Sequence, residues 1–405
     1  MKILQVNCVY NEGSTGKITH DIHKELLSRG MESVVYYGRR SKTTEPGVHK
    51  ICSEVYAKAN NLRSRVTGLM YGGCELSTAR LIRAIRKERP DVVHLQCING
   101  YFVNIYRLLE WLKQNRIRTV LTLHAEFMYT ANCGHARDCE KWKTGCGNCP
   151  RLKQETKSWF FDKTAVSWRR FQKIYENWDD LTVVCCSDWI RGRAARSGTL
   201  GKAQFRTIRN GIDHGSVFYP REDGAEAICR EYKLPPEKKR ILFVAPSFSE
   251  LKGFDLLQNL MESCRDLPFH FLLVGDCWDS APENATVIGP VRDQNLLARL
   301  YSGADALVMC SRCDTYPTVC LEAVCCGTPV AGFDVGGVKE TIPDGMGAVV
   351  PLGDMEGMKQ LLLELTAKRP EAQVVENARH RHSKARMVED YLRLYRTLCG
   401  ENRDQ

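Results

Sequence analysis

Two acidic residues, Asp314 and Glu322, stand where an open α/β sheet would bind a ligand. The apolar run 304–310 predicts a buried strand, and the run after Pro317 predicts a helix that carries Glu322 about one turn from its start. Ligands of such sheets bind at the carboxyl ends of the strands, where loops lead into helix N-termini. Two carboxylates placed there can accept hydrogen bonds from the vicinal hydroxyls of a sugar or a ribose.

The same pair has two other interpretations. A glycosidase acid and base also need two carboxylates, but at a set separation that a sequence does not give. A helix cap at Asp314 and a solvated helix face at Glu322 explain the residue types with no ligand at all. The downstream chain favours a ligand, because Gly336 and Gly337 lie between a predicted strand and a predicted helix. Paired glycines at such a turn expose backbone N–H groups to an anion.

The order and spacing of these motifs resemble those of the retaining nucleotide-sugar glycosyltransferases of family 4. Their carboxyl half carries an acid and a glutamate, then Gly-x-Pro-Val, then Gly-Gly-x-x-Glu, here Asp314–Glu322, Gly327–Val330 and Gly336–Glu340. The resemblance spans nearly the whole chain and is to the exopolysaccharide and colanic-acid type, with a cysteine-rich insertion. It implies an α/β protein of GT-B fold, with two Rossmann-like, doubly wound parallel-sheet domains facing each other across a cleft.

Length and composition suit a globular protein of two domains. We predict an acceptor-side domain over residues 1–213, a nucleotide-sugar-binding domain over 214–382, and a helix over 383–405 that returns to the first domain. The chain is 43% hydrophobic and 26% charged, and no apolar run approaches the ~20 residues of a membrane span. Because Met1–Val6 enters a strand without the layout of a signal peptide, we expect a cytoplasmic protein.

The formal net charge of +10 favours anionic partners. Residues 57–90 are basic and helical in pattern, with Leu81, Ile82 and Ile85 on one side. A basic amphipathic helix suits peripheral contact with an anionic membrane, here the inner membrane face, and a solvated helix face explains the same pattern. Nucleic acid is not an expected partner, because the cysteine-rich loop lacks the basic helix that zinc modules insert into a groove.

Two glycines follow the first predicted strand of the first domain, and a histidine ends a later one. Gly13 and Gly16 precede a helix, a position suited to phosphate, and His124 ends the strand Thr119–His124. From the residues alone, a plain strand–helix turn and a structural histidine explain both features. The resemblance implies that the glycines face the donor phosphates and the acceptor, and that His124 touches the donor sugar.

The second domain departs from the family pattern at two residues. The family clamps the donor pyrophosphate with an arginine and a lysine; Lys252 matches the lysine, and Ser247 stands at the arginine position. Backbone N–H groups or Arg312 would then replace the missing charge. Asp314 stands where glutamate is usual, which leaves the sugar identity open.

The resemblance assigns roles to these residues. Glu322 would bind the ribose hydroxyls, Asp314 and His124 the donor sugar, and Lys252 the pyrophosphate. The catalytic residues implied are His124, Lys252 and Asp314. The donor-binding set is Gly13, Gly16, Ser247, Lys252, Asp314, Thr318, Glu322, Gly336 and Gly337.

Cysteines cluster in an insertion, residues 129–150, that the common family pattern lacks. Cys146-x-x-Cys149 has the spacing of a metal half-site, and Cys133 and Cys139 would complete tetrahedral zinc, with His135 as a substitute ligand. An iron–sulfur cluster, a Cys146–Cys149 redox disulfide and unrelated buried thiols are alternatives. We favour structural zinc, because the loop has few apolar residues for a core.

Other cysteines stand singly in apolar runs, and we predict that they are small buried side chains. Those residues are Cys8, Cys185, Cys186, Cys310, Cys320, Cys325 and Cys326.

An aromatic-rich segment follows the insertion. Residues 159–175 predict a helix whose aromatic stripe packs in a core or, alternatively, offers an apolar groove to a lipid-linked acceptor. The aromatic residues are Trp159, Phe160, Phe161, Trp168, Phe171 and Tyr175.

The predicted function is the transfer of a hexose, with retention of configuration, from a UDP- or GDP-sugar to a saccharide acceptor. The acceptor is expected in exopolysaccharide or capsule biosynthesis, and a lipid-linked saccharide is one form that it can take. In the family the acceptor attacks from the leaving-group face and the departing phosphate takes its proton. No catalytic metal is therefore expected, which agrees with the lack of an Asp-x-Asp motif. The alternative is a non-catalytic sugar-nucleotide-binding or scaffold protein of the same fold, which Ser247 and Asp314 favour.

Overall fold

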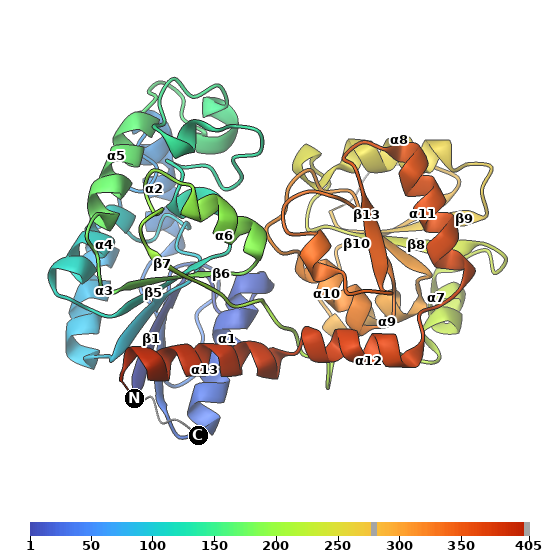
Figure 1. The fold of residues 1–405 in the computed structure, drawn as a ribbon, viewed down its shortest axis with the longest axis horizontal. Helices are drawn as coiled ribbons and strands as arrows, with labels where there is room; N and C mark the ends of the chain where they lie inside the picture. The colour runs from blue at the N-terminus through green and yellow to red at the C-terminus, as the bar shows by residue number, and fades with distance from the viewer. Residues whose placement is uncertain (277–281, 401–405) are drawn as a thin grey trace. The chain divides into compact units, whose positions relative to one another are not determined.

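The computed structural model describes residues 1–276 and 282–400 and divides the chain into two compact units (Figure 1). The first unit contains Met1–Ile208 and the residues from Val388 onward, and the second contains Arg209–Met387. Each unit is built on a parallel sheet, so the predicted α/β class with two parallel sheets is confirmed. The acceptor and donor roles predicted for the two parts stay predictions.

The sheet of the first unit has seven strands in the order β3-β2-β1-β4-β5-β6-β7, all paired in parallel. Its central strands are almost entirely buried, because helices cover both faces of a parallel sheet. The strands are β1 (Lys2–Asn7), β2 (Glu32–Tyr37), β3 (Val48–Lys50), β4 (Val92–Leu95), β5 (Thr119–Leu123), β6 (Leu181–Cys185) and β7 (Gln204–Thr207).

Three helices of the first unit start where polar side chains cap them. Ser53, Asn104 and Ser187 each accept a hydrogen bond from a backbone N–H of the first turn, which satisfies a group that the helix cannot. The helices are α1 (Gly13–Ser28), α2 (Glu54–Thr67), α3 (Glu75–Glu88), α4 (Ile105–Gln114), α5 (Thr164–Tyr175) and α6 (Asp188–Ala195). The basic stretch predicted over 57–90 is therefore two helices, because α2 ends at Gly68, whose φ of 73° is left-handed.

The aromatic helix predicted over residues 159–175 is wrong in its first part. The helix α5 begins only at Thr164, where Asp162 accepts hydrogen bonds from the backbone N–H and the hydroxyl of Thr164. The N–H of Trp159 donates to the carbonyl of Arg65 at 2.8 Å instead of to a helical neighbour. Trp168, Phe171 and Tyr175 are buried as predicted.

The second unit has a six-stranded parallel sheet in the order β10-β9-β8-β11-β12-β13. Its core joins Phe243, Phe271 and Phe333 of the strands to apolar residues of the covering helices. The strands are β8 (Lys239–Val244), β9 (Phe269–Val274), β10 (Ala285–Gly289), β11 (Ala306–Met309), β12 (Val330–Phe333) and β13 (Gly347–Val350). The helices are α7 (Gly224–Tyr232), α8 (Phe254–Ser263), α9 (Gln294–Gly303), α10 (Thr318–Cys325), α11 (Met355–Ala367) and α12 (Ala372–Arg381).

Most of the single cysteines behave as predicted. Cys8 is partly exposed, and the other six are buried in the cores of the two units. Among the described residues, no helix combines the length and the apolar composition that crossing a bilayer requires.

The last helix, α13 (Lys384–Leu398), begins in the second unit and ends in the first. Its Tyr395 hydroxyl lies 2.7 Å from Nδ1 of the buried His94 on β4, and Nε2 of His94 lies 2.7 Å from the hydroxyl of Thr122. The hydroxyl of Tyr391 lies 3.0 Å from the same Thr122 oxygen. Burial lowers the pKa of His94 to about 3, so the ring is neutral and both nitrogens depend on these partners.

We expect Tyr395→Phe to lower the free energy of unfolding of the first unit by about 1–3 kcal/mol, because it leaves a buried imidazole nitrogen unsatisfied. The control is Tyr175→Phe, since the Tyr175 hydroxyl is buried with no hydrogen-bond partner in the described part of the chain. Urea unfolding followed by circular dichroism measures both. Equal destabilisation by the two variants would contradict this account of how α13 is held.

Candidate active site

An ion pair lies beyond the carboxyl ends of the central strands of the second unit. The Lys252 Nζ lies 2.8 Å from Oδ2 of Asp314, and the two side chains are only 27% and 16% exposed. Gly253 allows this approach: its φ is 69°, and a Cβ there would lie 1.8 Å from the carbonyl oxygen of Cys310. The chain thus brings Lys252 to the loop after β11 by means of a residue without a side chain.

The Gly336–Gly337 turn after β12 closes the same site. The N–H of Gly337 donates to the carbonyl of Asp314 at 2.9 Å, and Gly336 has a φ of 60°. A Cβ on Gly336 would lie 1.9 Å from the same carbonyl oxygen. The structure therefore brings Lys252, Asp314, Gly336 and Gly337 together. It also corrects one expectation, because the N–H of Gly337 is bonded within the protein and is not available to an anion.

Glu322 lies one turn into α10, as predicted from the sequence. Its Oε2 accepts a hydrogen bond of 2.9 Å from the hydroxyl of Tyr301 on α9. Burial raises the pKa of Tyr301 well above its ordinary value, so the phenol stays protonated and donates. The contact fixes the orientation of the Glu322 carboxylate. Tyr301 was not among the predicted residues, because nothing in its own sequence context distinguishes it from a core tyrosine.

Thr318 is the first residue of α10 and is partly exposed. The helix begins after Pro317 without a side-chain cap and without an acidic residue in its first turn. The first backbone N–H groups of such a helix suit an anion or a polar ligand atom.

Two further residues of the second unit do not join the ion pair. Arg312 donates to both carboxylate oxygens of Asp255, at 2.8 and 2.6 Å, and to the carbonyl of Glu250. It therefore ties down the turn around Lys252, and the expectation that it replaces the missing charge is wrong. Ser247 is exposed in the loop after β8, and in the part of the chain that the structure describes no hydrogen bond links it to Lys252.

In the first unit His124 follows β5, at the carboxyl edge of the sheet. Its Nε2 lies 2.9 Å from Oε1 of Gln96, and the amide of Gln96 donates to Oε1 of Gln5 at 3.1 Å. Burial lowers the pKa of His124 to about 4, so at neutral pH it offers hydrogen bonds and no charge. Gln5 and Gln96 were not predicted, although a polar amide in or after an apolar strand is a signal that could have found them.

The two glycines before α1 differ in their surroundings. Gly13 begins the helix with a φ of 61°, and no atom lies within 4 Å of a Cβ built on it. A Cβ on Gly16 would lie 3.0 Å from a methyl group of Val9, and the N–H of Asn11 donates to the carbonyl of Gly16. Gly16 is therefore a packing glycine. Open space and an uncapped helix start lie at Gly13, and the role of both in donor binding stays a prediction.

The cysteine-rich insertion is anchored by a buried charged network that the sequence did not reveal. The carboxylate of Glu126 accepts hydrogen bonds from the Arg193 guanidinium at 2.7 Å, from the Tyr129 hydroxyl and from the N–H of Ala136. The ring of the buried Trp142 lies 4.8 Å from the same guanidinium. These contacts fasten the start of the loop, Ala136 and Trp142 to the unit.

The four predicted metal ligands, Cys133, Cys139, Cys146 and Cys149, are free thiols with partial exposure. Burial is the largest cause that raises the pKa of Cys133, and the thiols of Cys149 and Cys146 add to it. Cys139 likewise adds to the raised pKa of both Cys146 and Cys149. The four thiols are therefore electrostatic neighbours. No three of the sulfur atoms lie within 4.8 Å of one another, so an ion would have to draw them closer.

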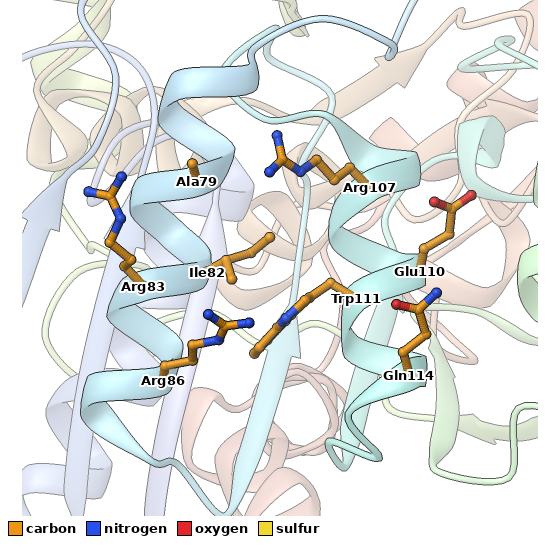
Figure 2. A pocket seen from close by; sticks show the side chains of 8 residues that line it. All are labelled: Ala79, Ile82, Arg83, Arg86, Arg107, Glu110, Trp111 and Gln114. Atoms are coloured by element: carbon orange, nitrogen blue, oxygen red, sulfur yellow. The ribbon is translucent and has the colours of Figure 1, made fainter.

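A separate pocket of about 350 Å³ lies between α3 and α4 (Figure 2). Arg83, Arg86 and Arg107 line it, and the Arg86 guanidinium lies 5.4 Å from the centroid of the Trp111 ring. None of the predicted donor-binding residues lines this pocket. It is therefore distinct from the candidate active site.

Comparison with protein families agrees with this arrangement of loops and strands. Residues 15–216 match the model described as Glycosyltransferase Family 4, and residues 238–368 match the model described as Glycosyl transferases group 1. This chain belongs to glycosyltransferase family 4.

Known relatives of this family 4 glycosyltransferase are distant. The putative colanic acid biosynthesis glycosyl transferase WcaC of Escherichia coli is 26% identical over 98% of this chain and all of the relative. Sucrose-phosphate synthase from Thermosynechococcus elongatus superposes with a TM-score of 0.69 at 18% identity, over 99% of this chain and 100% of that one. HepE of Anabaena, solved in complex with UDP-glucose, superposes with a TM-score of 0.65 at 13% identity, over 98% of this chain and 100% of that one. These structures confirm the GT-B fold with two Rossmann-like parallel sheets.

We expect Gly336→Ala to destabilise the second unit and to displace Asp314 from Lys252, because the added methyl group meets the Asp314 carbonyl. The matched control is Gly353→Ala, where φ is also positive, at 85°, but nothing lies within 4 Å of the added carbon. Backbone strain of about 1 kcal/mol is common to both variants, so the excess loss in Gly336→Ala measures the clash. Urea unfolding midpoints that fall equally would contradict the tight contact between this turn and Asp314.

Proposed function

We propose that this glycosyltransferase transfers a hexose, with retention of configuration, from a UDP- or GDP-sugar to a saccharide acceptor. The observation that supports the proposal best is the Lys252–Asp314 ion pair beyond the carboxyl ends of β8 and β11. Ligands of open parallel sheets bind at this edge. An ammonium held there can neutralise the charge that develops on a departing diphosphate, which is the largest electrostatic demand of the reaction.

The remaining side chains of the site suit the rest of a nucleotide sugar. Glu322, held by Tyr301, would accept hydrogen bonds from the two ribose hydroxyls. Asp314 lies next to Lys252, so a diphosphate that engages the ammonium brings the attached sugar near this carboxylate. Thr318 and the uncapped first turn of α10 add hydrogen-bond donors on the same helix. His124 and Gly13 remain our candidates for donor contact from the first unit.

The proposed chemistry uses the substrates' own atoms. The bond between the anomeric carbon and the donor phosphate oxygen breaks, and the acceptor hydroxyl oxygen bonds to the same face of that carbon. The acceptor proton passes to the departing phosphate oxygen. Lys252 stabilises the leaving diphosphate, and neutral His124 serves as a hydrogen-bond partner. No protein nucleophile and no catalytic metal enter this scheme.

An acceptor in exopolysaccharide or capsule biosynthesis is the proposed context. Its support is the Escherichia coli relative, which is named for colanic acid biosynthesis and matches over its whole length. A lipid-linked saccharide is the form of acceptor that we propose.

A non-catalytic protein that binds nucleotide sugars is the second candidate. Two observations favour it: Ser247 stands where the family has an arginine, and Arg312 is engaged with Asp255. Lys252 then meets the diphosphate without help from either position.

Thermal-shift titration with UDP- and GDP-sugars tests the proposal, because a ligand that binds only the folded protein raises its melting temperature. We expect Lys252→Ala to weaken donor binding about 10- to 100-fold, since it removes a charge-assisted contact with the diphosphate. Lys368→Ala is the control, because Lys368 forms an exposed surface pair with Glu371. An unchanged donor affinity in Lys252→Ala would contradict the placement of the diphosphate.

Donor turnover separates the two candidates. Release of free sugar or transfer to an acceptor by the native protein, lost in Glu322→Ala and Lys252→Ala, supports the enzyme. Donor binding with no turnover by the native protein would favour the non-catalytic candidate.

We also propose that Cys133, Cys139, Cys146 and Cys149 bind one structural zinc ion. The Cys-x-x-Cys spacing, the nearness of the four thiols and the anchored first part of the loop support this. His135 is a weaker ligand candidate, since a ring nitrogen lies within 4.8 Å of a Glu126 carboxylate oxygen. The ion would staple the loop and take no part in sugar transfer.

Metal analysis of the purified protein should find about one zinc per chain, and Cys146→Ser should lose it because three thiolates bind less tightly than four. Cys229→Ser, a partly exposed cysteine of the second unit, is the control and should keep the metal. Iron in place of zinc would favour the cluster, and a Cys146–Cys149 disulfide found by mass spectrometry would favour redox chemistry. Either result would overturn the zinc proposal.

A further inference from the structure

The first unit carries an apolar surface that faces solvent. Trp159, Phe160 and Phe161 are 50%, 68% and 54% exposed, and their rings contact one another in sequence. On α2, Val55, Leu62 and Val66 are also exposed. Their spacing of seven and four residues puts them on one side of the helix. We call these six residues the aromatic patch.

Backbone contacts hold the two halves of the aromatic patch together. The N–H of Trp159 donates to the carbonyl of Arg65 near the end of α2, and the hydroxyl of Ser158 donates to the carbonyl of Phe161 at 2.8 Å. A Cβ on Gly68 would lie 2.0 Å from the Phe161 carbonyl oxygen, so the tripeptide is packed against the end of α2. The aromatic rings are therefore presented to solvent by a turn that is fixed on its inner side.

The charges around the aromatic patch are positive. Lys58, Arg63, Lys157 and Lys163 are exposed, and among the described residues none of them forms a salt bridge with a carboxylate. Lys163 lies over the Phe161 ring, 5.9 Å from its centroid.

The nearby carboxylates offset only part of this positive charge. Glu54 pairs with Arg39 at 2.9 Å and with Lys50 at 3.2 Å. Asp162 accepts from the N–H groups of Cys149 and Thr164. Glu54 is thus paired with its own cations, whereas Asp162 keeps its charge and Glu155 lies near Lys157. The four exposed cations still outnumber these two acids, so the surface around the patch is cationic.

We propose that the aromatic patch docks this protein on a bilayer that contains anionic lipid. Indole and phenyl rings partition into the headgroup region, and a helix with an exposed apolar side lies in the plane of the interface. Lysines and arginines around the apolar side add attraction to anionic headgroups. Charge complementarity therefore selects an anionic lipid surface over a zwitterionic one.

The surface differs from the one that the basic sequence pattern suggested. In α3 the apolar residues Leu81, Ile82 and Ile85 are buried in the unit, so they cannot enter a membrane. The groove that α3 forms with α4 is basic, but its one aromatic ring, Trp111, already lies under Arg86 (Figure 2). The exposed apolar side chains that form the aromatic patch belong to α2 and to residues 159–161, whereas Leu76 is the exposed leucine of α3.

This inference deepens the proposed function and rests on it only for the lipid-linked acceptor, which would lie in the same bilayer. Docking through the aromatic patch would hold the first unit at the membrane surface, where such acceptors are found. Membrane binding itself can be measured without donor or acceptor, so the two proposals fail separately.

Flotation of the full-length protein with vesicles tests the docking surface. We expect the native protein to float with vesicles of phosphatidylcholine and phosphatidylglycerol in equal parts and to stay behind with phosphatidylcholine alone. The triple variant Trp159→Ser, Phe160→Ser, Phe161→Ser should partition at least about tenfold less, because three apolar side chains no longer leave water. Leu352→Ser, an exposed leucine of the second unit, is the matched control and should float like the native protein.

The charge requirement has its own variant. Arg63→Ala with Lys163→Ala should weaken binding to the anionic vesicles, and added salt should weaken binding of the native protein. An unchanged circular dichroism spectrum and melting temperature in all variants shows that they are folded.

Three results would overturn the inference. The first is a native protein that binds neither vesicle, and the second is a triple variant that floats as well as the native protein. The third is a native protein that is a dimer by light scattering and binds no vesicles, while the triple variant is a monomer. The aromatic patch would then join two copies of the chain. Vesicle binding without any donor binding would leave the inference standing and remove the proposed function instead.

Discussion

The parallel direction of the strands is the constraint on which the rest of this molecule depends. Parallel strands all end at one edge of their sheet, so loops that are far apart in the chain meet there. In the second unit Lys252 follows β8, Asp314 follows β11 and the Gly336–Gly337 turn follows β12, and all of them are in contact. In the first unit the same geometry joins Gln96 after β4 to His124 after β5, and Gln96 also bonds Gln5 within β1. The sheet topology therefore determines where the candidate site lies, and the individual side chains determine its chemistry.

Glycines and ion pairs fix the loops at this edge of the second sheet. Gly253 and Gly336 have left-handed φ angles and leave no room for a Cβ, so they let two loops approach β11 and Asp314 more closely than other residues would. Arg312 with Asp255 closes the turn that carries Lys252. Charged residues therefore serve two purposes here: Arg312 and Asp255 shape the loop, while Lys252 and Asp314 remain together at the strand edge, where a phosphate could compete for the ammonium.

The first unit combines a core held by buried hydrogen bonds with a surface that exposes large apolar side chains to water. The chain Tyr395–His94–Thr122–Tyr391 fixes α13, and Glu126 with Arg193 fixes the cysteine-rich loop. Beside these, the aromatic patch leaves large apolar side chains in water, which marks a surface for interaction and not for folding. A fixed interior with an apolar, cationic exterior is the arrangement expected of a protein that works next to a lipid surface.

The sequence by itself determined the α/β class, the order of most strands and helices, and the motif at Asp314 and Glu322, because apolar periodicity and glycine spacing are local properties. It also carried the family resemblance that the comparisons bear out. Only the tertiary structure decided that Arg312 is engaged with Asp255, that Tyr301 holds Glu322, and that Gly337 has its N–H bonded within the protein. The same holds for residues 159–161, whose aromatic spacing suggested a buried helix but whose backbone bonds to α2 and leaves the rings in solvent. Such outcomes depend on which distant segment supplies the hydrogen-bond partner or covers the side chain, and that information is not present in the spacing of residues along the chain.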